Sequence, residues 1–183
     1  MKKMGRYIIA CIVTVLLFGV SGCGVSQKSP EKVTKSLIEN YVKGKEKKVK
    51  QCYGQVKDTN KELQAEIDAR IKYYQAHNAQ KVKITACDIL SEDKNDAYVY
   101  IIYNLILKNN QEYPCIGTYM TQKKDGKYYI LPPSAITDDM RDQAVIDYKK
   151  FMTTDNYKNY KKAYDTFIKK NPGYEDKVAG KLR

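Results

Sequence analysis

The side chains of this 183-residue chain that could carry chemistry are five cysteines, one histidine and scattered carboxylates. Cys23 is the first candidate, because the two small residues Ser21 and Gly22 precede it at the end of an apolar run. Small residues leave the backbone open to a protease, and a cysteine thiolate is a good nucleophile. The segment around Cys23 is therefore the first place to look for covalent chemistry.

The first 22 residues have the layout of a secretory signal peptide. They contain three cations and no acidic residue, followed by a 13-residue run over 8–20 that only Thr14 and Gly19 interrupt. The cations are Lys2, Lys3 and Arg6. A membrane-spanning helix needs about 20 apolar residues, so this run is short for a permanent span. A basic start, a short apolar middle and small residues at the end favour a cleaved signal.

The four residues "VSGC", Val20 to Cys23, resemble the lipobox of bacterial lipoproteins. The resemblance implies cleavage between Gly22 and Cys23, with a diacylglyceryl group on the Cys23 thiol. It also implies a protein that is lipid-anchored in the cell membrane and faces outside the cytoplasm. Val20 stands where that family most often has leucine. The alternatives are an ordinary secretory signal with a chance cysteine, or an uncleaved membrane helix.

The remaining chemistry-bearing residues do not predict a catalytic or metal site. Beyond Cys11 and Cys23, the chain has Cys52, Cys87 and Cys115, an odd number without the spacing of metal ligands. His77, the only histidine, has no obvious partner in the sequence. We expect no metal, no cofactor and no catalytic residue.

Net charge points to a membrane environment rather than to nucleic acid. The chain carries +12, and removing the three cations of residues 1–22 leaves +9. The lysines are spread along the chain without an arginine cluster or a nucleic-acid-binding motif. We expect anionic lipid or cell-wall polymers as surroundings, and no nucleic-acid partner.

The periodicity of apolar residues predicts an α+β fold. Turn residues separate four β-rich segments, and Asp125-Gly126 predicts a two-residue hairpin turn. Helix starts are predicted at Ser29-Pro30-Glu31, at the capping box Thr59 to Glu62 and at Thr137. Residues 174–183 are expected to fray. The expected helices are 30–44, 46–53, one from Thr59, one from Thr137 and 156–170, and the expected strands are 81–90, 97–107, 112–121 and 127–132.

Treating each connection as a simple hairpin assigns side chains to the two faces of the sheet. The face expected against the helices holds Val82, Ile84, Ala86, Val99, Ile101, Leu105, Ile116, Met120 and Leu131. The opposite face holds Cys87, Tyr98, Tyr100, Ile102, Asn104, Cys115, Gly117, Tyr119, Tyr128 and Ile130. Cys87 and Cys115 then lie two strands apart, about 9.6 Å, so we expect free thiols.

This layout, closed by "KKDGKYYIL" (123–131), resembles the nuclear-transport-factor-2-like, or cystatin-like, α+β cone. The resemblance implies N-terminal helices packed on a curved antiparallel sheet, with a pocket that serves as an active site in some members. Tyr128-Tyr129 stands where that family frequently has tryptophan. Asp88 is expected on the core face and tyrosines are plentiful, but no histidine, glycine-rich loop or metal cluster supports catalysis, so we expect no enzyme. The resulting organisation is a signal peptide (1–22), a tether (23–28), a cone-like domain (29–136) and a C-terminal helical extension (137–183).

These features favour a membrane-tethered, non-catalytic binding or assembly module outside the cytoplasm. Its partner would be a protein or a cell-wall ligand. The candidate partner surface is tyrosine-rich and combines the outer sheet face with the tail helices: Tyr98, Tyr100, Tyr119, Tyr128, Tyr157, Tyr160 and Tyr164. The alternatives are a small-molecule-binding or isomerase-like protein that uses the cone pocket, and a subunit of a secretion or conjugation apparatus.

Overall fold

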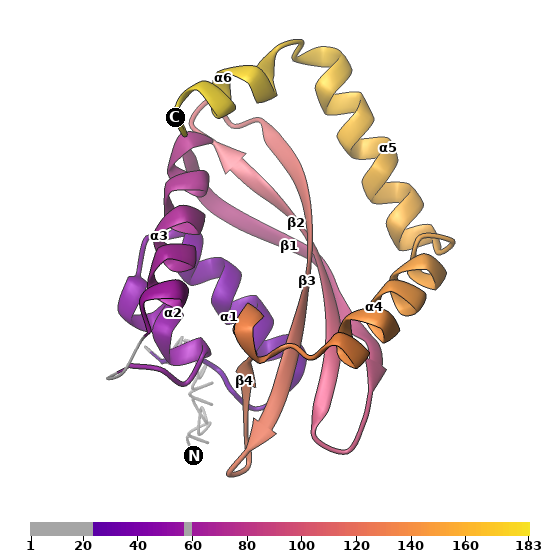
Figure 1. Cartoon of the computed structure of the whole chain (residues 1–183). Helices are drawn as coiled ribbons and strands as arrows, with labels where there is room; N and C mark the ends of the chain where they lie inside the picture. Colours follow the sequence, from indigo (N-terminus) through magenta and orange to yellow (C-terminus); the bar gives the residue numbers. More distant parts are fainter. Residues whose placement is uncertain (1–23, 57–59) are drawn as a thin grey trace, which may run out of the picture.

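The computed structural model describes residues 24–56 and 60–183 (Figure 1). Its four strands form one antiparallel sheet in the order β1-β2-β3-β4, with helices before and after it in the chain. The elements are α1 Pro30–Val42, α2 Glu46–Cys52, α3 Lys61–Ala76, β1 Ala79–Glu92, β2 Asp96–Leu107, β3 Glu112–Lys124, β4 Lys127–Ile130, η1 Pro133–Ala135, α4 Asp138–Phe151, α5 Asp155–Lys170 and α6 Tyr174–Gly180. The predicted α+β fold with a curved antiparallel sheet is confirmed.

Capping side chains set the helix starts. Ser29 accepts a hydrogen bond from the Lys32 amide at the start of α1, and Pro30 occupies the first helical position. At the start of α3 the cap is Asn60, whose Oδ1 lies 2.7 Å from the Leu63 amide. The predicted capping residue, Thr59, lies outside the described residues. The helix therefore begins one residue later than the capping box predicted.

One face of the sheet, called here the inner face, packs under α1, α2 and α3. Residues of α1 such as Leu37 and Ile38 are fully buried against Ile101 and Leu105 of β2. Figure 1 shows these three helices gathered on one side of the curved sheet. The large apolar area that they bury together makes this the main core of the protein.

The predicted faces are right for β2 and wrong by one residue for β3. Ile106 pairs with Glu112, which leaves a three-residue turn at 108–110, and Asn110 takes a left-handed conformation with φ of 60°. A type I turn followed by such a residue is a common three-residue hairpin. The expected four-residue turn put Ile116 and Met120 on the inner face. In the structure Cys115, Gly117 and Tyr119 take those places, and Tyr128 and Ile130 of β4 follow them inward.

A bulge in β1 changes a second part of the predicted register. The pairing with β2 shifts between Ile84 and Ala86 and leaves Thr85 unpaired. An extra residue reverses the alternation of side chains beyond it. Val82 and Ile84 therefore face inward as expected. Beyond the bulge Ala86 packs on the outer cluster and Cys87 on the inner one, opposite to the prediction.

The C-terminal extension covers part of the other, outer face and then closes one end of the sheet. Tyr100 and Ile102 of β2 pack on Phe151 of α4 in a second, smaller core. Residues 174–183, expected to fray, instead include α6, which lies beside the end of α3 in Figure 1. Val178 is buried, and Lys181 Nζ lies 2.9 Å from the Ala76 carbonyl oxygen. The prediction of a frayed end is wrong.

The predicted leader, with Gly22 and Cys23, falls outside the described residues. Within 24–56 and 60–183, none of the helices combines the length and the hydropathy that crossing a membrane requires.

Candidate functional site

The seven tyrosines of the predicted partner surface do not lie together on one open surface. Tyr119 and Tyr128 belong to the inner face because of the register described above. Tyr100 is buried under Phe151, with ring centroids 4.3 Å apart. Tyr98 lies half-buried on the outer face, while Tyr157, Tyr160 and Tyr164 line the side of α5 that packs toward the sheet. One of these rings is thus buried, and the other six are half-buried in separate parts of the protein.

A groove runs between α4 and the outer face of β2 and β3. We call it the α4 groove, and its volume is about 460 Å³. Its lining residues are Tyr98, Ile116, Gly117, Thr118, Ala144, Val145, Tyr148, Lys149 and Met152. Val145 is 53% exposed, Met152 is 43% exposed, and the neighbouring Ile146 is 49% exposed. Large apolar side chains therefore face solvent along one wall of the groove.

The groove continues at one end into an acidic recess of about 410 Å³. The two share Tyr98 and Ala144. The recess is lined by Ser91, Glu92, Asp93, Asp96, Ala97, Tyr98, Met120, Asp139, Met140, Gln143 and Ala144. Its four carboxylates come from the β1–β2 hairpin and the first turn of α4. The surface thus combines an apolar channel with a negatively charged mouth.

A buried carboxylate holds α4 in place beside this groove. Asp147 accepts a hydrogen bond from Gln143 at 3.0 Å, and Lys150 Nζ lies 3.4 Å away. A hydrogen bond from Ser91 of β1, followed by those from Gln143 and Lys150, lowers the pKa of Asp147. The carboxylate therefore stays ionised and links α4 to the end of β1.

The inner face is filled by side chains that satisfy one another. The hydroxyls of Tyr41 and Tyr53 lie 3.1 Å apart, and those of Tyr74 and Tyr103 lie 2.8 Å apart. Burial raises the pKa of each of these phenols well above its usual value. They are neutral partners in a packed core rather than acids or bases at neutral pH.

His77 joins α3 to α6 at the closed end of the sheet. Its Nδ1 lies 2.8 Å from the Tyr174 hydroxyl, and burial lowers its pKa to about 4. The Tyr113 and Tyr164 hydroxyls donate to the neighbouring Glu175 carboxylate at 3.0 and 2.5 Å. His77 is only 4% exposed, so this pair connects two helices inside the protein.

The remaining sequence candidates are placed as follows. Cys52, Cys87 and Cys115 are free thiols, as predicted, and burial raises the pKa of each to about 12. Asp88 is exposed, and its carboxylate accepts a hydrogen bond from the next amide, Ile89. Among the described residues no cluster of histidine, cysteine and carboxylate side chains has the arrangement of a metal site.

Sequence reasoning missed the α4 groove. On α4, an apolar stripe that includes Ala144 and Tyr148 faces the sheet. Val145 and Ile146, beside that stripe, carry the exposed apolar surface. Two adjacent apolar residues on an otherwise polar helical face were the available signal.

The fold and the groove define an α+β protein with a packed inner core and a partly open outer face. No protein-family model and no curated protein matches the chain. Solved structures similar to it include a Campylobacter jejuni protein provisionally described as an NTF2-like transpeptidase, with 17% identity and a TM-score of 0.39 over 57% of this chain and 98% of that one. A SEC-C motif containing protein from Rhodopseudomonas palustris is 16% identical, with a TM-score of 0.41 over 58% and 78%. Neither likeness assigns a family or an activity.

Proposed function

We propose that this protein is a lipid-anchored, extracytoplasmic and non-catalytic module that binds a protein partner through the α4 groove. The anchor rests on the sequence: a basic start, a short apolar run and "VSGC" ending at Cys23. The observation that carries the binding role is the exposed apolar side chains of Val145 and Met152 in the groove wall, with the exposed Ile146 next to Val145 in the chain.

Apolar side chains gathered beside a groove are typical of interaction sites. Burying about 300 Å² of apolar surface contributes about 7 kcal/mol before the entropic cost of association. The acidic recess supplies charge complementarity, since Glu92, Asp93 and Asp96 attract a cation. The expected partner segment therefore combines apolar side chains with a lysine or an arginine at one end.

The potentially reactive groups of the inner face are unsuited to catalysis, which favours a binding role for the protein. Its phenols are paired, its thiols are protonated at neutral pH, and His77 is buried against Tyr174. A general acid or base must reach the substrate proton, and these groups are enclosed by the core.

The anchor is tested by the intact mass of the membrane-extracted protein, compared with Cys23→Ala. We expect the wild-type chain to begin at Cys23 with added lipid mass, and the variant to lack that mass. A mature wild-type protein that retains residues 1–22 would contradict the anchor.

The groove is tested with a photo-crosslinking residue at position 145 in cell membranes. A single extracytoplasmic partner should be captured, and capture should fall at least about tenfold in Met152→Asp, because a charge in the groove opposes apolar burial. Ala179→Asp, exposed on α6, is the matched control and should leave capture unchanged. Equal capture by both variants would show that the partner does not use the groove.

A further inference from the structure

The N-terminal segment is bound to the body of the protein from Ser26 onward. The Ser26 amide donates to Ser36 Oγ of α1 at 3.1 Å. The Tyr128 amide of β4 donates to the Gln27 carbonyl oxygen at 3.0 Å, and Gln27 Nε2 donates to the Gln51 carbonyl oxygen of α2 at 3.1 Å. Residues 26 and 27, expected to belong to a free tether, are therefore fixed against three elements.

This attachment leaves a very short path to the proposed lipid. Three residue steps separate Ser26 from Cys23, and an extended chain spans at most about 3.6 Å per residue. At most about 11 Å of extended chain therefore joins the bound segment to the proposed lipid. A lipid on Cys23 would hold this end of the protein against the headgroups.

We propose that the end of the protein formed by the β3–β4 hairpin and the bound N-terminal segment is a membrane-docking surface for anionic lipid. The inference rests on the lipid at Cys23 in the proposed function, and it adds a fixed orientation to that anchor.

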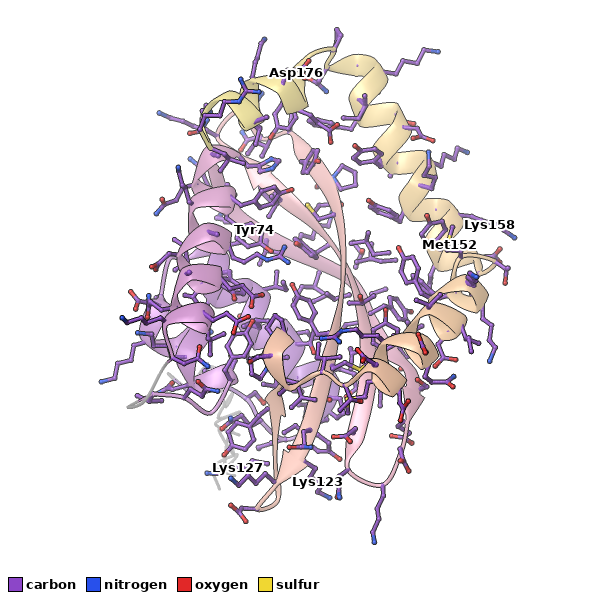
Figure 2. The ribbon with its side chains drawn as sticks, viewed as in Figure 1. Tyr74, Lys123, Lys127, Met152, Lys158 and Asp176 are labelled. Carbon is purple, nitrogen blue, oxygen red and sulfur yellow. The ribbon has the colours of Figure 1, made fainter. Side chains whose placement is uncertain are left out.

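Positive charge supports the docking surface. Lys123, Lys124 and Lys127 are exposed on the hairpin, with Asp125 as the one acidic residue between them. Lys123 Nζ lies 5.7 Å from the centre of the Tyr128 ring, whose own amide bonds to Gln27. Figure 2 shows Lys123 and Lys127 together at this end. Lysines next to an anionic leaflet are attracted within about one Debye length.

Apolar side chains next to the same segment suit the headgroup region. A cavity of about 640 Å³ opens there, lined by Val25, Gln27, Gln51, Gly54, Gln55, Val56 and Tyr129. Val56 is 42% exposed, and Tyr129 is half-buried. Tyrosine and lysine together are typical of surfaces at the membrane–water interface.

The neighbouring β1–β2 hairpin carries three carboxylates and one lysine, Lys94, so its net charge is opposite in sign. Its Asn95 carbonyl oxygen accepts a hydrogen bond from the Lys123 amide at 2.7 Å, so the two hairpins lie side by side. Glu92, Asp93 and Asp96 line the acidic recess on this hairpin. Anionic lipid attracts one hairpin and repels the other, which keeps the recess and the α4 groove open to the aqueous side.

The test uses the lipidated full chain in vesicles made from equal parts of phosphatidylcholine and phosphatidylglycerol. A membrane-impermeant amine-acylating reagent modifies the lysines, and mass spectrometry gives the rate at each position. Acylation of Lys123, Lys124 and Lys127 should be at least about threefold slower than in detergent micelles, because headgroups cover them. The matched controls Lys158, Lys162 and Lys169, exposed on α5, should react equally in both.

A second variant tests whether the short tether is what brings the hairpin lysines to the membrane and protects them. A flexible Gly-Ser insertion between Gly24 and Val25 keeps the bonds of residues 26 and 27 but lengthens the tether. It should bring the acylation rates of the hairpin lysines closer to their values in detergent.

Hairpin lysines whose acylation in vesicles is slowed no more than that of the α5 lysines would overturn the orientation. Intact mass of the same sample distinguishes the two proposals: lipid present with unprotected lysines overturns the orientation alone, and lipid absent overturns the anchor and the orientation together.

Discussion

The two faces of the sheet are covered in different ways. On the inner face, three helices bury aliphatic side chains completely, and the tyrosine hydroxyls there bond to one another. On the outer face, α4 buries Phe151 and Tyr100 but leaves Val145 and Met152 partly in solvent. The same α4 that completes a small core therefore also forms one wall of a groove.

Under the proposed function, this difference separates stability from recognition within one sheet. A fully buried core contributes to folding in proportion to the apolar area removed from water. A partly covered face contributes less to folding and retains apolar area that a partner can bury. Substitutions on the inner face should therefore change the free energy of unfolding, and those on the groove wall should change binding.

The largest contrast is expected between Leu105→Ala and Val145→Ala. Leu105 is fully buried on the inner face, so its truncation should lower the free energy of unfolding by about 4 kcal/mol. Val145 is mostly exposed, and its truncation should cost less than about 0.5 kcal/mol. Urea denaturation followed by circular dichroism measures both. Similar losses would mean that the groove wall is part of the core.

Acid should weaken the closed end of the inner core through His77. Its pKa is about 4 in the folded protein, and the ordinary value of 6.5 applies after unfolding. The unfolded chain therefore binds more protons between these values, and stability falls as pH is lowered through this window. The loss should approach about 3 kcal/mol. Urea denaturation between pH 7 and pH 5 should show most of this loss in the wild type. In His77→Gln the free energy of unfolding should depend less on pH.

Helix α6 tests whether the C-terminal extension belongs to the inner core. Val178 is buried where α6 meets the rest of the protein, so Val178→Ala should lower the free energy of unfolding by about 2 kcal/mol. The exposed Ala179→Ser on the same helix is the control. Thermal unfolding of the two variants makes the comparison, and an unchanged midpoint for Val178→Ala would place α6 outside the cooperative unit.

The smallest effect is expected for the hydroxyl pair of Tyr74 and Tyr103. Either single substitution to phenylalanine leaves a buried hydroxyl without its partner and should cost about 1 to 2 kcal/mol. The double variant removes both hydroxyls and should cost less than the sum of the two. A double-mutant cycle in urea gives the coupling. Additive losses would show that the two hydroxyls act independently.

Local sequence signals predicted the helices and strands well. The assignment of side chains to the two faces of the sheet, in contrast, depended on single residues. Ser29, Thr137 and Asp125-Gly126 mark their helix starts and hairpin turn through chemistry that is visible in sequence. The left-handed Asn110 and the bulge at Thr85 each shift the pairing by one residue. Lys108 to Gln111 is compatible with either turn length, and the choice depends on packing of the whole sheet. For the same reason the α4 groove could not be placed beforehand, since it needs the correct face of β3.

The bulges of β1 have a further consequence at the edge of the sheet. In the order β1-β2-β3-β4, β1 is an edge strand, and its pairing shifts at three places. Lys81 and Lys83 stand exposed along it. Irregular, charged edges resist pairing with the edge of another sheet. The lipid anchor proposed above would confine molecules to two dimensions and raise their local concentration, and this edge of β1 would then keep neighbouring copies from joining strand to strand.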